Sequence, residues 1–174
     1  MGRAALPLSS HPHNSRELHL TAMTIEPGVY RISSLETSSP IGRYYLEDMS
    51  LLPKVIMTLP NVEIQPLPPT LNVDTGERGY FIKALGVSTG LRDNSNEVVA
   101  VVVDEVGGKI VEWNLKPAGS EDQYLICHPE NSNDVWTVSD EDAPPQTGEK
   151  LISVTKLQAG NPKQIFSFEK AAPQ

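Results

Sequence analysis

Hydrophobic and polar residues alternate with a period of two along most of the chain after Thr24, and this pattern predicts β-strands. Residues two apart point to the same face of a strand, so an apolar pair at this spacing is expected to face the core. Three segments share a tyrosine followed two residues later by an isoleucine: Tyr30 with Ile32, Tyr80 with Ile82, and Tyr124 with Ile126. The tyrosines stand 50 and 44 residues apart, which indicates a repeated unit.

A second recurring strand is expected to close each unit. The apolar residues Ile64, Trp113 and Phe166 stand at equivalent places in the closing segments, which are Val62–Leu67, Val111–Pro117 and Gln164–Lys170. Two further apolar segments lie between opener and closer in each unit. They are Arg43–Asp48 with Lys54–Leu59, Gly86–Asp93 with Glu97–Glu105, and Asp134–Asp140 with Lys150–Leu157. The pattern therefore predicts four strands in each of three units.

Three units of four strands predict an all-β fold of 12 strands, the β-trefoil. One unit cannot bury its own apolar face, whereas three units around a pseudo-threefold axis share a core and leave no open sheet edge. The 15 prolines and 12 glycines also interrupt the chain too often for long helices. Another all-β sandwich or barrel is the alternative. The domain is expected over residues 24–170, after a disordered extension over 1–23 and before a tail over 171–174.

The amino-acid composition limits the possible binding partners and the cellular location of the protein. The formal net charge of -8 disfavours nucleic acid, and no apolar run approaches the roughly 18 residues that span a bilayer. The single cysteine, Cys127, cannot form an intrachain disulfide, which fits either a reducing compartment or a fold that is indifferent to oxidation. The first residues lack the apolar core of a signal peptide, although Arg3, Arg16 and several serines leave a transit peptide as an alternative. We therefore expect a cytoplasmic protein that acts as a monomer.

No residue pattern indicates catalysis, a cofactor or a metal. Cys127 and His128 are adjacent on a predicted strand and point to opposite faces, so they do not form a nucleophile–base pair. The acidic run Ser139–Pro145 lacks the ligand spacing of a calcium loop. Trp113 is interpreted as a core residue, while Trp136 is either a core residue or a platform for a sugar ring. The sequence thus predicts a protein that is not an enzyme.

The connection Glu47–Pro53 carries bulky apolar residues where a turn usually carries small polar ones. Pro53 favours an extended conformation at the preceding residue, so the segment is expected to protrude as a partly extended strip. Glu47 and Asp48 are expected to accept hydrogen bonds from local backbone amides. Alternatively, the leucines fold back onto the barrel. The candidate binding residues are Asp48, Met49, Ser50, Leu51 and Leu52.

Several segments together resemble the mushroom β-trefoil serine protease inhibitors of family I66. These are "IEPGVYRI", "IGRYYLEDMSLLPKVIMTLP", "GYFIKA", "VEWNL", "WTVSD" and "IFSFEK", within residues 24–170. The resemblance implies a serine endopeptidase as partner and a reactive loop between the second and third strands. It implies that the residue after the acidic pair, here Met49, is P1, the residue that enters the S1 pocket of the protease.

Trypsin-inhibiting members of the family carry a basic P1 residue. Met49 is uncharged, so the resemblance implies chymotrypsin-, elastase- or subtilisin-like targets, in fungal defence or in internal regulation. Lys163, in the connection Leu157–Gln164, is a secondary candidate for contact with trypsin. A carbohydrate-binding β-trefoil lectin and a cysteine protease inhibitor, as in the related mycocypins, are the alternative functions.

Overall fold

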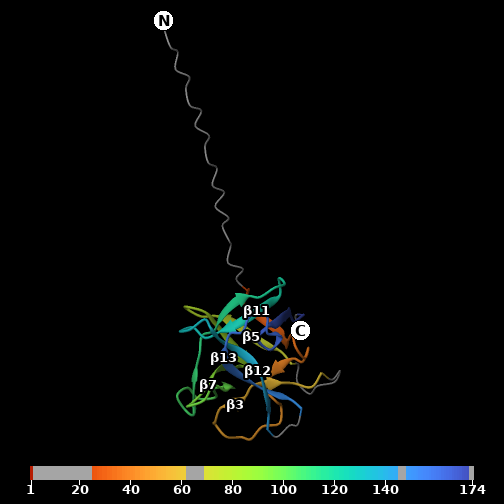
Figure 1. The fold of residues 1–174 in the computed structure, drawn as a ribbon. Coiled ribbons are helices and arrows are strands. Elements are labelled where there is room, and N and C mark those ends of the chain that lie inside the picture. The colour runs from red at the N-terminus through yellow and green to blue at the C-terminus, as the bar shows by residue number, and fades with distance from the viewer. Residues whose placement is uncertain (2–24, 62–68, 145–147, 173–174) are drawn as a thin grey trace.

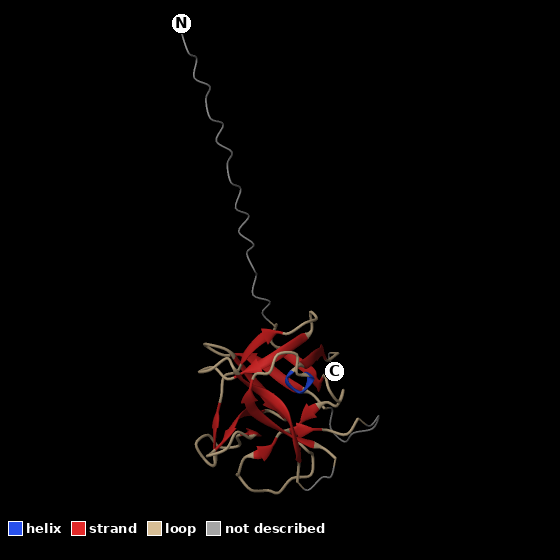
Figure 2. Ribbon diagram, viewed as in Figure 1, coloured by secondary structure: helices blue, strands red, loops and turns tan. Residues whose placement is uncertain are grey.

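The computed structural model describes residues 1, 25–61, 69–144 and 148–172 of the 174 residues, and these form strands, loops and one short 3₁₀ helix (Figures 1 and 2). The strands are β1 (Gly28–Ser34), β2 (Ile41–Gly42), β3 (Lys54–Val55), β4 (Met57–Thr58), β5 (Leu71–Thr75), β6 (Tyr80–Ala84), β7 (Val87–Arg92), β8 (Val98–Ala100), β9 (Gly108–Ile110), β10 (Asn114–Pro117), β11 (Gln123–Cys127), β12 (Asp134–Asp142), β13 (Lys150–Lys156) and β14 (Phe166–Lys170). The helix is η1 (Pro162–Gln164), and no helix of the described chain is long and apolar enough to cross a membrane.

Six strands follow one another around a ring of antiparallel pairs. β1 pairs with β14 and with β5, β5 pairs with β6, and β11 pairs with β10 and with β14. The sixth link is a reciprocal backbone pair between Tyr80 of β6 and Trp113, the residue before β10, with two N–H···O distances of 2.8 Å. The ring thus uses the first and last strand of each repeat, and the molecule is the predicted β-trefoil.

Six of the eight other strands form three antiparallel hairpins that are joined to one another. β2 pairs with β4, β7 with β8, and β12 with β13. Ile56 links all three, because its N–H donates to Val98 O at 3.3 Å and its carbonyl accepts from Ile152 N at 3.1 Å. Ile56, Val98 and Ile152 are fully buried, one from each repeat. They mark the place where the three units meet.

The observed strands differ from the expected ones in the first repeat. The expected closing strand Val62–Leu67, with Ile64, lies outside the described residues, and its place in the ring is taken by β5. The prediction of a strand over Arg43–Asp48 is wrong, since β2 ends at Gly42. An ion pair joins Arg43 to Glu47, and four residues of extended chain would separate them by about 13 Å.

The expected strand Lys54–Leu59 is also divided. Ile56 turns its backbone groups toward two different hairpins, and this separates β3 from β4. A further short strand, β9, adds to β7 with Gly90 opposite Ile110. A Cβ at Gly90 would lie 1.9 Å from Lys109 O, so this close approach requires glycine. These two features explain why the described chain has more strands than the predicted 12.

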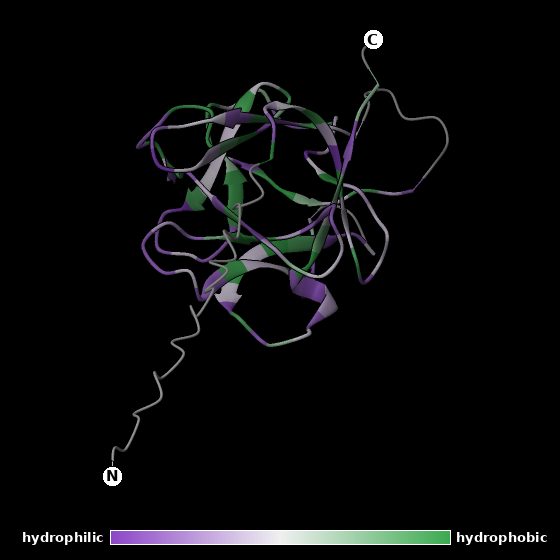
Figure 3. Cartoon of the chain, turned by 90° about the horizontal axis from the view of Figure 1, so that it is seen from above, coloured by the Kyte–Doolittle hydropathy of each residue, from purple (hydrophilic) through white to green (hydrophobic). Residues whose placement is uncertain are grey.

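The repeated apolar residues form the core, as the sequence predicts. Ile32, Ile82 and Ile126 are fully buried, and so are Trp113 and Phe166 of the closing segments. Figure 3 shows apolar residues gathered on the strands around the centre, with polar residues on the connecting loops. Each repeat therefore contributes its apolar strand face to one shared interior.

Trp136 belongs to the same interior, which resolves its ambiguous assignment. Its side chain is fully buried, and its ring meets that of Trp113 edge to face with centroids 5.3 Å apart. It is therefore not exposed to stack on a sugar. Cys127 is also fully buried, and burial raises the pKa of its thiol, so this cysteine is a structural residue.

The buried indole N–H of Trp113 donates to Thr89 Oγ1 at 2.9 Å, and Thr89 is itself fully buried. Thr89→Val keeps the shape of the side chain but leaves this donor unpaired. We expect a loss of about 1–3 kcal/mol in the free energy of unfolding, measured by urea denaturation. The matched variant Thr75→Val, at an exposed position, is expected to change it by less than about 0.5 kcal/mol. Equal effects of the two variants would contradict this role.

Candidate functional site

The connection between β2 and β3, residues 43–53, is the most exposed apolar segment among the described residues. Figure 1 shows it as the orange loop at the end of the molecule near β3. Met49 is 97% exposed, and Leu46, Leu51 and Leu52 are 63%, 64% and 56% exposed. Leu51 and Leu52 therefore do not fold back onto the barrel. Side chains of this kind are normally buried, so the loop is a candidate contact surface for another molecule.

The first half of the loop is held by Arg43 and Glu47. The Arg43 guanidinium donates to both carboxylate oxygens of Glu47, with Nε 3.2 Å from Oε1. It also donates to Ala84 O, at the end of β6, at 3.4 Å. The two side chains are only 11% and 18% exposed, so solvent screens this bidentate pair less than an ordinary surface ion pair. Glu47 thus accepts from a guanidinium, instead of the backbone amides that the sequence suggested.

The second half of the loop is held by Lys54, whose side chain is only 8% exposed at the start of β3. The Lys54 ammonium forms an ion pair with Asp48 Oδ1, and it donates to Asp48 O at 3.2 Å and to Ser50 Oγ at 3.0 Å. Asp48 Oδ1 also accepts from Ser50 N at 2.9 Å, the local backbone bond expected from the sequence. Both neighbours of Met49 are therefore tied to one buried ammonium, while the Met49 side chain projects into solvent.

These donors stabilise the charged form of Asp48. Lys54, followed by the hydroxyl and N–H of Ser50, lowers the pKa of the Asp48 carboxyl from 3.8 to about 2. A group with a lowered folded-state pKa stabilises the structure above its unfolded pKa. The contribution of Asp48 is thus fully present above about pH 4 and is lost as the pH falls toward 2. The loop keeps this restraint at neutral and mildly acidic pH.

The exit of the loop rests on the connection between β8 and β9. Pro53 is buried, and a Cβ at Gly107 would lie 3.1 Å from Pro53 Cδ. Gly107 also has a positive φ of 69°, which favours glycine. The turn between β6 and β7 lies on another side of the loop, since Leu85 and Met49 line the same hollow. The loop is therefore supported by neighbours from the second repeat.

Lys163, the secondary candidate, has a different environment. It lies in η1, and its ammonium pairs with Asp140 Oδ1 at 2.5 Å. The hydrogen bond from Lys163 lowers the pKa of Asp140, and the same bond raises the pKa of Lys163. The Lys163 side chain is 27% exposed. Its charge is already paired within the chain, in contrast to the free side chain of Met49.

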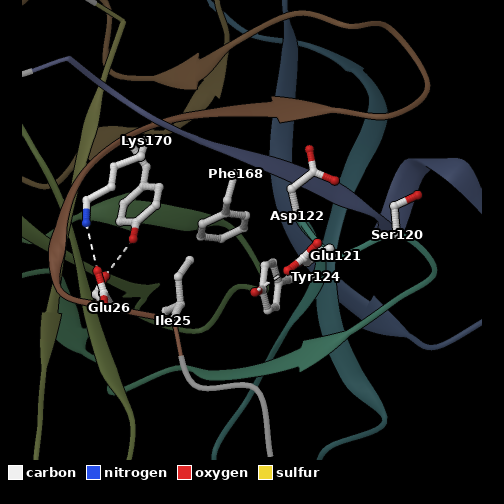
Figure 4. A pocket seen from close by; sticks show the side chains of 9 residues that line it. Ile25, Glu26, Ser120, Glu121, Asp122, Tyr124, Phe168 and Lys170 are labelled. Carbon is white, nitrogen blue, oxygen red and sulfur yellow. Dashed lines mark hydrogen bonds and ion pairs between the residues drawn. The ribbon is translucent and has the colours of Figure 1, made fainter.

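A second pocket shares no lining residue with the loop. Figure 4 shows the rings of Tyr124 and Phe168 beside Ile25, with Lys170 paired to Glu26 at 2.9 Å. The hydroxyl of Tyr30 donates to Glu26 O at 2.7 Å. Glu26 is thus already bonded to two neighbours. The rest of the lining is polar as well as aromatic, since it includes Ser120, Glu121 and Asp122.

Lys54 and Arg43 were not among the predicted site residues. Their signals in the sequence are an Arg–Glu pair four apart and an Asp–Lys pair flanking an apolar run. The five candidate residues 48–52 do lie together on one exposed loop.

Comparison with known proteins gives both a family and a fold. The family model described as Peptidase inhibitor I66 matches residues 23–170. A proteinase inhibitor from Coprinopsis cinerea is 19% identical, with a TM-score of 0.67 over 85% of this chain and 100% of that chain. A ricin B-like lectin from Macrolepiota procera, solved with lactose, is 14% identical, with a TM-score of 0.62 over 85% and 99%. An agglutinin from Rhizoctonia solani is 12% identical, with a TM-score of 0.60 over 86% and 99%.

At these identities the solved structures establish only the shared β-trefoil fold. A comparison with curated protein sequences gave no match.

The contact between Lys54 and Asp48 predicts how the pKa of the Asp48 carboxyl changes when Lys54 is replaced. In Lys54→Met, an unbranched apolar side chain replaces the buried ammonium, so the Asp48 carboxyl loses its main stabilising donor. We expect its pKa to rise from about 2 toward the ordinary 3.8, as followed by NMR titration of the carboxyl carbon. Asp134, which pairs with Lys156, serves as the internal control and is expected to keep its titration. An unchanged Asp48 midpoint would show that Lys54 does not hold the loop.

Proposed function

Because this chain belongs to the I66 family of peptidase inhibitors, we propose that it inhibits serine proteases by placing loop 43–53 in their active-site cleft. Family membership makes the chain an inhibitor and not an enzyme. The proposal adds the class of protease, the loop and the residue: Met49 enters the S1 pocket as P1. The inhibitor acts as a monomer that binds one protease molecule.

The observation that carries the proposal is the contrast between Met49 and its two neighbours. Met49 is 97% exposed, while Asp48 and Ser50 are both bonded to Lys54. A side chain that is free to enter a pocket thus stands on a backbone that is already restrained. Such pre-organisation reduces the conformational entropy lost on binding. A single fully exposed anchor also fits the rule that few residues supply most of the binding energy.

The same geometry accounts for inhibition without efficient cleavage. Attack by the protease serine on the Met49 carbonyl would break the Met49–Ser50 bond, and the proton would pass to the Ser50 nitrogen. The new amine would stay close to the acyl-enzyme, because Ser50 is tied to Asp48 and Lys54 and its chain continues into β3. A retained leaving group favours re-formation of the bond over hydrolysis.

The chemistry of Met49 sets the expected targets. Methionine is unbranched and uncharged, so it fits the apolar S1 pocket of chymotrypsin- or subtilisin-like proteases. The S1 pocket of trypsin contains an aspartate, which is left without a cation when methionine enters. Leu51 and Leu52 follow the scissile bond and are exposed, so they face the primed side of the cleft.

The lectin alternative has no comparable support, because both tryptophans that might stack on a sugar are fully buried. Inhibition of cysteine proteases is tested together with the main proposal by including papain.

Met49→Arg is expected to reverse the specificity. An arginine at P1 pairs with the trypsin aspartate, so trypsin inhibition should strengthen roughly 100-fold. Chymotrypsin inhibition should weaken, because the charge would be buried without a partner. The measurement is the inhibition constant against trypsin, chymotrypsin, subtilisin, elastase and papain.

Val29→Arg is the matched control, because it adds the same charge at an exposed apolar residue of β1, outside both candidate connections. It is expected to leave all the inhibition constants unchanged. If Met49→Arg and Met49→Ala both inhibit like the original chain, Met49 is not the P1 residue.

A further inference from the structure

The exposed apolar surface of the chain is concentrated around the reactive loop but is larger than that loop. Of the twelve large apolar side chains exposed in the described part of the chain, eight lie on three neighbouring connections. Five belong to loop 43–53, one to the turn between β6 and β7, and two to the connection between β8 and β9. They are Tyr45, Leu46, Met49, Leu51, Leu52, Leu85, Val103 and Val106.

The connection between β8 and β9, residues 101–107, is built directly against the reactive loop. β8 pairs with β3, with Ala100 opposite Lys54, so it leaves the sheet beside the anchor of the loop. Val102 lines the same hollow as Met49, and Gly107 packs on Pro53. The two connections therefore form one continuous surface.

The tip of this connection is ordered and strained. Val106 N donates to Val103 O at 3.2 Å, which closes a tight turn over Asp104 and Glu105. Asp104 Oδ1 accepts from Ile110 N at 3.1 Å and ties the turn to β9. Glu105 has a positive φ of 64°, a conformation that is uncommon outside glycine and is often kept at functional sites.

The turn presents two apolar and two acidic side chains to solvent. Val103 is 38% exposed and Val106 is 43% exposed, with Asp104 and Glu105 exposed between them. In the reactive loop, by contrast, Glu47 and Asp48 are each paired with a cation. On this surface, therefore, Asp104 and Glu105 are the acidic side chains that form no ion pair within the described chain, and they lie next to apolar groups.

The size of a stable interface explains why a second contact is needed. A standard complex buries about 800 Å² on each partner and uses roughly 20–30 residues a side. The reactive loop alone supplies fewer residues than that. A protease that accepts Met49 must therefore also meet neighbouring connections, and the surface continues onto residues 101–107.

We infer that the turn Val103–Val106 is a second contact site for the target protease, and this inference rests on the proposed function. The matching protease surface has an apolar patch beside the S1 pocket and a basic residue at its rim. Val103 and Val106 would cover the apolar patch, while Glu105 would attract the basic rim. The turn would then select among proteases that share an apolar S1 pocket.

The test uses Val103→Ser with Val106→Ser in the full chain, measured by surface plasmon resonance against the proteases of the panel. The dissociation rate from the preferred protease is expected to rise about tenfold, since apolar contacts act mainly after docking. Val29→Ser, the same change at an exposed valine of β1 outside both candidate connections, is expected to have no effect. The melting temperature of each variant checks that the fold is unchanged.

Glu105→Gln gives an independent readout, because it removes one charge from the turn and keeps the side-chain shape. The association rate is expected to fall at low salt and to depend less steeply on ionic strength. Glu169→Gln, at an exposed position on β14, is the matched control.

The two hypotheses fail in different ways. Unchanged rates for the serine double variant and for Glu105→Gln would overturn the second contact site, while the Met49 variants would still report on the reactive loop. If the Met49 variants bind every protease like the original chain, the reactive loop itself is misassigned, and the second contact site is overturned with it.

Discussion

The backbone of Ile56 joins the three hairpins of the trefoil, and the geometry of the candidate site depends on this junction. Its N–H bonds to the second repeat and its carbonyl to the third. The junction is fully buried, so its hydrogen bonds do not compete with water. It fixes β3, which directly precedes Ile56 and begins with Lys54. Lys54 in turn holds Asp48 and Ser50, and these two residues position Met49. A contact at the pseudo-threefold axis thus helps to determine the position of an exposed side chain.

The candidate loop 43–53 combines exposed apolar groups with internally paired charges. Arg43 with Glu47, and Lys54 with Asp48, neutralise the ionic groups on either side of the apolar tip. A partner that buries the tip therefore does not have to desolvate isolated charges. The pairs also restrain a segment that has little regular structure, and this restraint is what a substrate-like inhibitor requires. In the proposed mode of inhibition, Met49, the most exposed side chain of the loop, would determine which S1 pocket the loop fits.

The β-trefoil itself does not decide between inhibitors and lectins, since solved proteins of both kinds share it. In this chain the two tryptophans, which were the candidates for stacking on a sugar, are buried in the core, whereas the apolar residues of the β2–β3 connection are exposed. Function on this scaffold therefore depends on which connections carry exposed side chains.

The threefold repeat and the residues of the core could be predicted from the sequence alone. The Tyr–Ile spacing reflects the period of a strand, and the recurrence of closing residues such as Trp113 reflects three units with one shared interior. It also singled out Met49, because a bulky residue in a turn is unusual for purely local reasons. The end of β2 at Gly42 was not predictable, because "RYYLED" contains a short apolar run that is typical of a strand, and Arg43 meets Glu47 and Ala84 only in the folded chain. The burial of Lys54 was decided by the tertiary structure alone, since a lysine is buried only where the folded chain brings it acceptors, here Asp48 and Ser50 across the loop.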